Sequence, residues 1–332
     1  MSHVVGVDLG GTKTAAALVG ADGQVGTVLT VPTPARSGPD AILDSVARLV
    51  ETVLAQAAGA GPAPQLAAVG IGTAGVVDAS RGTIVSATDV LPGWAGTDVA
   101  GGVRARLAAS AGLTGAALPV VVENDVDAHA AGEAWLGAAA GARIALMVAV
   151  GTGVGGAVVL DGTPLRGAHH LAGEMGHMPV PGADGLICGC GRPGHLEALG
   201  SGPALHRHYL RLGGDDAAAD TRAVVARAAG GDLLARRAVA ESAACVGRAI
   251  AAICTVLDPD VVVVGGGLAQ AGPLWWDPML QALRDDVIDP LAGLPVLPAA
   301  LGSQAAIVGA AGAAHRHLGR TLTLPCPPKD TP

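Results

Sequence analysis

Short apolar runs separated by glycine corners alternate along the chain with longer stretches of helical periodicity. Residues 4–9, 14–19 and 25–31 are β-rich, and glycine-containing turns separate them, which predicts an antiparallel meander. Residues 40–57 have the 3.6-residue spacing of an amphipathic helix, with Asp40 as its N-cap. Further strands are expected at 66–71, 120–122, 144–150, 157–160 and 261–264, and further helices at 97–108, 125–136, 203–212, 221–229, 232–257 and 304–317.

The second half of the chain echoes the first. A strand–glycine–strand unit at 144–160 has the layout of 4–19, which indicates an internal duplication. A chain of 332 residues also suits two domains of roughly 150 residues each. We place a smaller α/β domain at 1–122, together with a C-terminal helix at about 303–320, and a larger α/β domain at 123–302 that carries a loop rich in His and Cys.

Composition narrows the classes of function. The net charge is -8, Phe is absent and there is one Tyr, so neither a basic footprint nor an aromatic platform for nucleic acid is available. Mean hydropathy is positive, but the longest uncharged stretches, 52–77 and 290–315, are broken by Gly and Pro, so no membrane span is expected. The N-terminus enters a strand at once, without the pattern of a signal peptide. We therefore expect a cytoplasmic protein.

Two glycine corners have the character of phosphate-binding hairpins. In the first, Asp8-Leu9-Gly10-Gly11-Thr12-Lys13, backbone N–H groups can form an anion nest, and Thr12 and Lys13 can add a hydroxyl and a charge. Asp8, at the strand end, is suited to holding Mg²⁺ through water. The alternative is an ordinary tight turn with a solvated Lys13.

The second corner matches the glycine spacing of a dinucleotide-binding fingerprint but not the secondary structure that the fingerprint requires. Gly151-x-Gly153-x-x-Gly156 is followed by a strand, whereas the fingerprint requires a helix whose N-terminus meets the pyrophosphate. No Gly-x-x-x-x-Gly-Lys-Ser/Thr sequence occurs, which excludes a P-loop. Gly265-Gly266-Gly267 ends a further strand and leads toward a helix.

Taken together and in order, these motifs resemble the ROK family of repressors, open reading frames and sugar kinases, within the actin-like ATPase superfamily. The resemblance covers about residues 4–315. It implies an α/β, two-domain actin-like ATPase (ribonuclease H-like) fold with a central cleft, and binding of ATP with Mg²⁺. By the same resemblance, the nucleotide residues are Asp8, Gly10, Gly11, Thr12, Lys13, Gly151, Thr152, Gly153, Gly155, Gly265, Gly266 and Gly267.

Glu123-Asn124-Asp125-Val126 resembles the family's catalytic motif. The resemblance makes Asp125 the base that accepts the proton of the sugar 6-hydroxyl, with Asn124 on a neighbouring hydroxyl. From the residues alone, capping of the helix that follows is the favoured interpretation of Asn124-Asp125. The other sugar-binding residues implied are Gly75, Asp89, Glu174, His177 and Glu197.

The Cys and His residues resemble the family's zinc signature, with one departure. The ligands would be His177, Cys188, Cys190 and His195, where His195 stands in place of the usual third Cys. Two Cys and two His form an ordinary tetrahedral structural zinc site. The alternative is a loop held by hydrogen bonds, with two free thiols.

The resemblance implies an ATP-dependent hexose 6-kinase, with glucose as the first substrate to consider. Val90 stands where many members carry Asn, and Asp127 replaces a frequent Asn. With Asp89 adjacent to Val90, an aminohexose, N-acetylmannosamine or N-acetylglucosamine stays open as the substrate, as does polyphosphate as the donor. A sugar-responsive repressor is disfavoured, because family repressors carry a helix-turn-helix segment before the first phosphate motif and only seven residues precede Asp8. A homodimer or homotetramer is expected.

Overall fold

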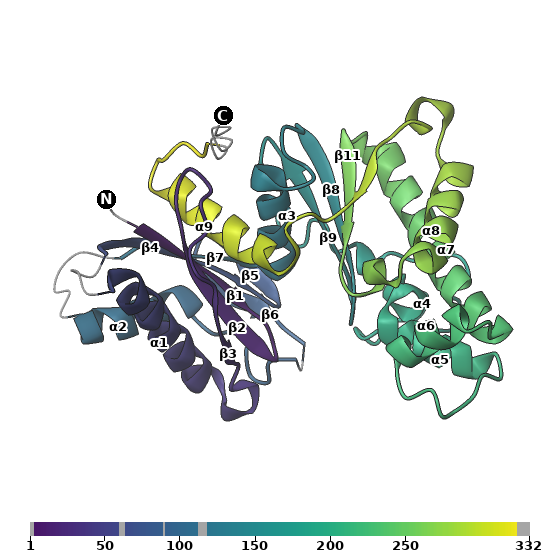
Figure 1. Cartoon of the computed structure of the whole chain (residues 1–332), viewed down its shortest axis with the longest axis horizontal. Helices are drawn as coiled ribbons and strands as arrows, with labels where there is room; N and C mark the ends of the chain where they lie inside the picture. The colour runs from purple at the N-terminus through teal and green to yellow at the C-terminus, as the bar shows by residue number, and fades with distance from the viewer. Residues whose placement is uncertain (1–2, 60–63, 89, 112–117, 324–332) are drawn as a thin grey trace, which may run out of the picture. The chain divides into compact units, whose positions relative to one another are not determined.

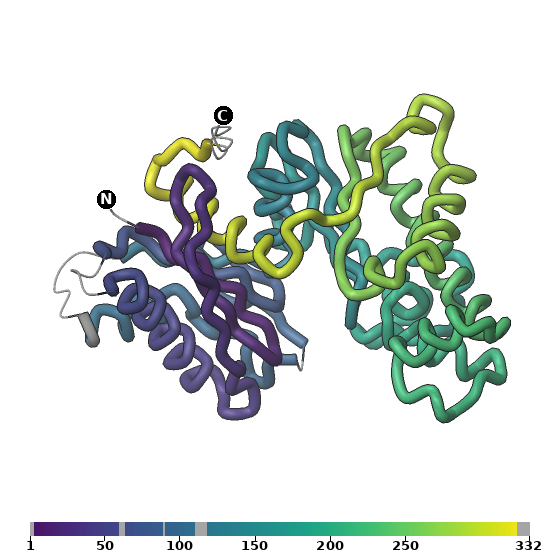
Figure 2. The backbone as a smooth tube through the Cα atoms, in the orientation of Figure 1, coloured from purple at the N-terminus to yellow at the C-terminus, as the bar shows by residue number. Residues whose placement is uncertain are grey.

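The computed structural model describes residues 3–59, 64–88, 90–111 and 118–323, which form two compact units. The first unit contains the chain up to Gly141, residues 162–171 and the chain from Ala300. The second contains Ala142–Asp161 and Ala172–Ala299. The chain therefore passes between the units four times, and both described ends belong to the first unit (Figure 2).

A five-stranded sheet in the order β3-β2-β1-β4-β7 forms the centre of the first unit. β1 pairs antiparallel with β2 and parallel with β4, which pairs parallel with β7, so three strands have their carboxyl ends at one edge. The strands are β1 (His3–Leu9), β2 (Lys13–Val19), β3 (Leu29–Pro32), β4 (Leu66–Thr73) and β7 (Val120–Asn124), and a separate hairpin is formed by β5 (Val76–Asp78) and β6 (Thr83–Ser86).

Helices cover both faces of this sheet (Figure 1). On one face, α1 (Pro39–Ala58) and α2 (Val99–Ala111) bury apolar side chains against the strands. On the other face lies α9 (Ala305–His317), packed against α3 (Asp125–Leu136). A Cβ on Gly309 would lie 1.8 Å from the carbonyl oxygen of Ala128, so the two helix backbones touch at a position that only glycine permits.

The second unit repeats the strand arrangement. β8 pairs antiparallel with β9 and parallel with β11, which pairs parallel with β12, as β1 does with β2, β4 and β7, and this confirms the predicted duplication. The strands are β8 (Ile144–Val150), β9 (Val154–Leu160), β11 (Val261–Gly265) and β12 (Val296–Pro298), and the two-residue strand β10 (Thr163–Pro164) lies in the segment 162–171. The helices are α4 (Glu197–Gly200), α5 (Gly202–Arg211), α6 (Thr221–Ala229), α7 (Leu233–Leu257) and α8 (Pro273–Asp286). Five short 3₁₀ turns, η1 (Ala35–Ser37), η2 (Met175–His177), η3 (Leu268–Ala271), η4 (Asp289–Leu291) and η5 (Gly302–Gln304), complete the described elements.

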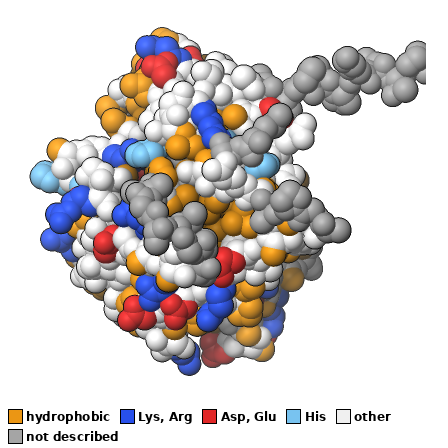
Figure 3. Space-filling view, turned by 90° about the vertical axis from the view of Figure 1, so that its left-hand side faces the viewer, with side chains coloured by type: hydrophobic (Ala, Val, Ile, Leu, Met, Phe, Trp, Pro, Cys, Tyr) orange, Lys and Arg blue, Asp and Glu red, His pale blue; other side chains and the backbone are white. Residues whose placement is uncertain are grey.

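α7 is long and apolar enough to qualify as a membrane span by length and composition. Its buried residues, among them Val246 and Ile250, pack into the main core of the second unit. That packing is typical of the central helix of a folded domain. On the face of the molecule drawn in Figure 3, acidic and basic side chains are interspersed, which agrees with the absence of a basic footprint in the sequence.

The structure corrects several expectations. The third strand covers Leu29–Pro32 rather than 25–31, because Val25 makes only an isolated bridge to Val19. Gly38, not Asp40, is the N-cap of α1, since Pro39 occupies the first helical position. The β5–β6 hairpin and α8 were not anticipated.

The domain boundary placed after residue 122 also differs from the observed division. Residues 123–141 belong with the first unit. The reason is the close packing of α3 on α9, which cannot be read from periodicity.

Candidate functional site

The carboxyl edge of the first sheet gathers the predicted catalytic residues. Asp8 in β1, Gly72 in β4 and Glu123 in β7 are aligned across the three parallel strands, and Asp125 begins α3 directly after β7. Ligands of open α/β sheets bind outside this edge. Asp8 and Asp125 interact electrostatically. Burial, followed by the charge of Asp125, raises the pKa of Asp8 to about 6, although the charge of Lys13 opposes the shift.

Asp125 is a half-buried carboxylate at the N-terminus of a helix. Burial raises its pKa, while the N–H of Val126 and the neighbouring His129 act in the opposite direction. Its Oδ1 accepts a hydrogen bond from the N–H of Val126 at 3.0 Å. A carboxylate with a raised pKa is closer to the range in which a general base works at neutral pH.

Asn124 caps α3, as the purely structural alternative predicted. Its Oδ1 accepts hydrogen bonds from the N–H groups of Val126 at 2.8 Å and Asp127 at 3.2 Å. Its Nδ2 donates to the carbonyl oxygen of Gly75 at 2.9 Å, which brings two predicted sugar residues together. The side chain of Asn124 also hydrogen-bonds the carboxylate of Asp125, which counteracts the rise in the pKa of Asp125 caused by burial. Asp89, the other expected sugar residue of this unit, lies outside the described residues.

The first glycine corner is a tight turn held by threonine. The N–H of Gly10 donates to the carbonyl oxygen of Lys13 at 3.1 Å, and the hydroxyl of Thr33 donates to the carbonyl oxygen of Gly10 at 2.7 Å. Thr12 and Lys13 are exposed, as a phosphate-binding role requires. No local pattern marks Thr33, because it follows β3 and is 23 residues from Gly10 in the chain.

A cavity of about 710 Å³ in the second unit opens at the second glycine corner. Gly151, Thr152 and Gly267 line it, so two of the predicted nucleotide motifs meet there. Its apolar walls come from α6 and from the segment at η3 and α8, where no binding residue was predicted from the sequence. The wall residues are Val225, Ala226, Ala229, Leu268, Ala271 and Leu274. Gly265 and Gly266 do not line it. A Cβ on Gly266 would lie 2.4 Å from the carbonyl oxygen of Val150, so this glycine brings β11 against β8.

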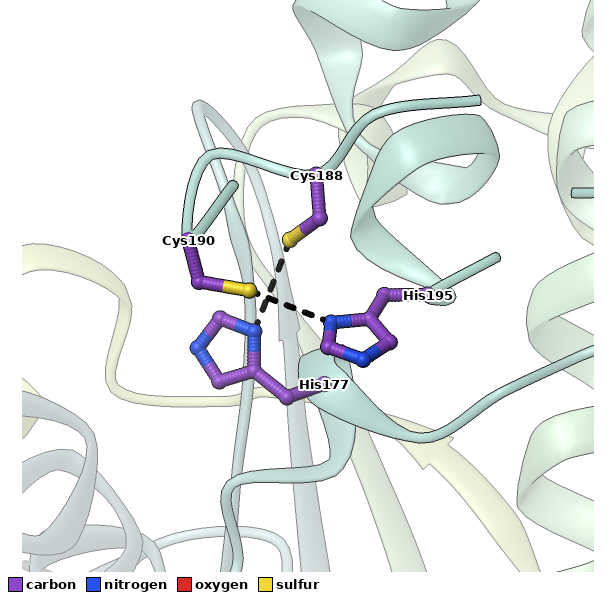
Figure 4. A group of neighbouring side chains, drawn as sticks. All are labelled: His177, Cys188, Cys190 and His195. Atoms are coloured by element: carbon purple, nitrogen blue, oxygen red, sulfur yellow. Dashed lines mark hydrogen bonds between the residues drawn. The ribbon is translucent and has the colours of Figure 1, made fainter. Parts of the chain in front are cut away.

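The four predicted zinc ligands converge in the second unit (Figure 4). Their ligand atoms all lie within 4.8 Å of one another. Sγ of Cys188 is 3.5 Å from Nδ1 of His177, and Sγ of Cys190 is 3.3 Å from Nδ1 of His195. In a tetrahedral zinc site with bonds of about 2.3 Å to sulfur and about 2.0 Å to nitrogen, the S···N edge is about 3.5 Å, so these residues fit the ion.

The two predicted sugar-binding glutamates lie around this cluster. Glu174 Oε2 is 3.9 Å from Nε2 of His177, the ring nitrogen that does not face the cysteines. This separation is longer than a hydrogen bond, so the contact between these two atoms is electrostatic. Glu197 accepts a hydrogen bond from the N–H of Val154 at 3.2 Å, and its other oxygen is 3.5 Å from Sγ of Cys188. Glu197 thus links the glycine corner to the Cys/His cluster.

Known proteins resemble the chain over nearly its whole length. The sequence model of the ROK family matches residues 4–317. A glucokinase of Streptomyces coelicolor is 35% identical over 331 residues, which cover 94% of this chain and 97% of that protein. An N-acetylmannosamine kinase of Shigella flexneri is 34% identical over 269 residues, covering 81% of this chain and 84% of that protein.

A solved structure extends the likeness to three dimensions. The crystal structure of a ROK family glucokinase from Streptomyces griseus, in complex with glucose and AMPPNP, is 31% identical, with a TM-score of 0.76. The match covers 95% of this chain and all of that one (100%). The α/β fold expected from the sequence is therefore that of ROK kinases, which have the actin-like ATPase fold. Sequence, fold and the order of the motifs agree, and the chain belongs to the ROK family.

Proposed function

We propose that this protein is an ATP:hexose 6-phosphotransferase with glucose as its first substrate. The observation that carries the proposal is the placement of Asp125: a half-buried carboxylate with a raised pKa, at the carboxyl edge of parallel strands and beside a glycine hairpin. Membership of the ROK family and the likeness to glucokinases support it.

In the proposed reaction, Asp125 accepts the proton of the sugar 6-hydroxyl as its oxygen bonds to the γ-phosphorus of ATP. The bond from that phosphorus to the bridging oxygen breaks, and ADP leaves with the electron pair. Asn124, next to Asp125, is the residue that would hold a neighbouring hydroxyl of the sugar. Mg²⁺, when bound with ATP, would neutralise the β- and γ-phosphates, and Asp8 is the residue suited to hold it through water.

The second unit supplies the proposed nucleotide site. The N–H groups of Thr152 and Gly153 in this corner would donate hydrogen bonds to phosphate oxygens, and the apolar walls of the 710 Å³ cavity would take the adenosine. Zinc, when bound by His177, Cys188, Cys190 and His195, would be structural, because four protein ligands leave no open position. Through His177 and Glu174, it would fix the loop proposed to hold sugar hydroxyls.

A coupled ADP-release assay over glucose, mannose, aminohexoses and N-acetylhexosamines tests the reaction and the substrate. Asp125→Asn should lower kcat by about 10²-fold or more with the fold intact. Asp127→Asn is the matched control: it makes the same change two residues along, and should keep turnover within about threefold. Equal turnover by Asp125→Asn and wild type would rule out the assigned base. Preference for an aminohexose or for N-acetylmannosamine would replace glucose as the substrate.

The same family resemblance supports a cytoplasmic homodimer or homotetramer. Size-exclusion chromatography with light scattering would measure the molar mass in solution and distinguish these states from a monomer.

A further inference from the structure

One buried carboxylate, that of Glu133 in α3, lies next to two of the places where the chain passes between the units. Its side chain is 1% exposed and accepts three backbone hydrogen bonds. Oε2 accepts from Ala138 at 2.8 Å and from Ala300 at 3.1 Å, and Oε1 accepts from Leu301 at 2.8 Å. Both oxygens are therefore in use.

The donors flank two chain crossings. Ala138 lies three residues before the first crossing, which follows Gly141, while Ala300 and Leu301 come directly after the last one. The main-chain carbonyl of Glu133 also accepts hydrogen bonds from Gly137 at 3.1 Å and Ala139 at 3.0 Å. A single residue thus fixes the first-unit ends of both crossings.

The second-unit ends of the same crossings have anchors of their own. Asp260 Oδ2 accepts hydrogen bonds from the N–H groups of Arg143 at 2.9 Å and Ile144 at 2.8 Å. The N–H of Ala299 donates to the carbonyl oxygen of Val264 at 3.0 Å. In the first crossing, only the stretch around Gly141 lies between the contacts of Glu133 and those of Asp260. In the last crossing, only the peptide between residues 299 and 300 lies between the contacts of Glu133 and that of Val264.

Gly141 has the conformation of a backbone pivot. Its φ is +86°, in the region that favours glycine, and a Cβ built there would meet nothing within 4 Å. Hinges are usually a few loop residues that absorb a change of φ and ψ while the flanking backbone is held.

We propose that Glu133 is a positioning residue that clamps two of the four crossings, so that within these two crossings the change of conformation accompanying catalysis is confined to the short backbone stretches between the anchors. This inference rests on the proposed function, because enzymes of phosphoryl transfer commonly close on their substrates before the reaction. Glu133 touches no reacting atom in this scheme. Its effect is on how often bound sugar reaches the reactive arrangement, so it acts on kcat more than on sugar affinity.

The chemistry of the clamp defines a sharp test. An ionised carboxylate offers acceptors on both oxygens, whereas a carboxamide offers one oxygen and an NH₂ that cannot accept. Glu133→Gln must therefore lose at least one of the three hydrogen bonds while keeping the side-chain volume. Asp260→Asn is the matched control, because both of its N–H partners converge on one oxygen, which the amide oxygen can replace.

Two readouts are measured on the full-length variants: steady-state kcat and KM with glucose and ATP, and backbone hydrogen exchange at 137–142 and 299–302 with and without sugar. For Glu133→Gln we expect kcat to fall about tenfold, KM for sugar to stay within about twofold, and exchange to accelerate at both crossings together. Asp260→Asn should keep kcat and exchange near wild type.

A second variant keeps the test decisive if Glu133→Gln folds poorly. Leu301→Pro removes the N–H that donates to Oε1, at a φ of -86° that is close to the range of proline, and leaves the other two hydrogen bonds of Glu133 in place. It also removes the packing of the leucine side chain, so Leu301→Ala is measured beside it as the control. Accelerated exchange with unchanged kcat would overturn the positioning role, and unchanged exchange would overturn the clamp. The exchange readout does not depend on turnover, so an inactive wild type would reject the proposed function and leave the clamp to be judged by exchange alone.

Discussion

Replacing Asp8 with Asn should stabilise the protein at neutral pH while it removes the proposed kinase activity. The physical basis is the raised pKa of Asp8, about 6 against 3.8 for an unperturbed carboxyl, caused first by burial and then by the charge of Asp125. Between these two values, the unfolded chain loses its proton before the folded one does. The folded state therefore loses stability as the pH rises through this window, and the full cost is present above about pH 6.

The magnitude follows from the size of the shift. A difference of 2.2 pH units (6 minus 3.8) corresponds to about 3 kcal/mol at pH 8, and the same two values give about 1 kcal/mol at pH 4.5. Because the side chain is not fully buried, these figures are upper bounds. An uncharged, nearly isosteric Asn escapes the cost, so the gain from Asp8→Asn should grow with pH by up to about 2 kcal/mol between pH 4.5 and pH 8.

Urea denaturation at the two pH values, followed by tryptophan fluorescence, measures this difference, and Trp94 and Trp135 report on the first unit. Asp215→Asn provides a control of opposite sign, because the N–H of Ala217 and then Arg227 lower the pKa of Asp215. That variant should be less stable than wild type above pH 4. An Asp8→Asn gain that is equal at both pH values, or a loss at pH 8, would refute the assignment of a desolvated carboxylate. Activity should fall at least tenfold, since the proposed Mg²⁺ position loses its charge.

Three further outcomes are expected. Purified protein should hold about one equivalent of zinc by elemental analysis, and Cys190→Ser should lose most of it and become easier to cleave by protease within 177–197; equal zinc in both proteins would show that Cys190 is not a ligand. Arg166→Met should destabilise the protein by about 2 kcal/mol in urea titrations, because it leaves the 1%-exposed Glu123 carboxylate without its ion-pair partner. Adding Glu123→Gln to Arg166→Met should restore part of that loss, and additive losses would argue against a coupled pair. The acidic limb of the kcat/KM profile should lie above the usual carboxyl range, since burial raises the pKa of Asp125; a flat profile down to pH 4 would contradict its role as base.

Local pattern determined much of this protein. Helix 125–136 and strand 144–150 were predicted residue for residue, because the signals of strands and helices depend on residues close together in the chain. The repeated strand–glycine–strand unit revealed the duplication, since each copy carries its own turn signal. The spacing of His177, Cys188, Cys190 and His195 brought four ligand atoms within 4.8 Å, because they belong to one short loop whose closure is a local matter.

Tertiary structure decided whatever depended on partners distant in sequence. The apolar walls of the nucleotide cavity come from α6 and from the start of α8, about 70 and 120 residues after the glycine corner they complete, and single small apolar residues there carry no motif. The domain boundary moved because α3 packs against a helix that begins 180 residues later (305 minus 125). Glu133 reads as an ordinary helix residue until folding brings residues 300 and 301 onto its carboxylate. Propensity acts between neighbours in the chain, whereas burial, charge pairing and close backbone contact act between neighbours in space.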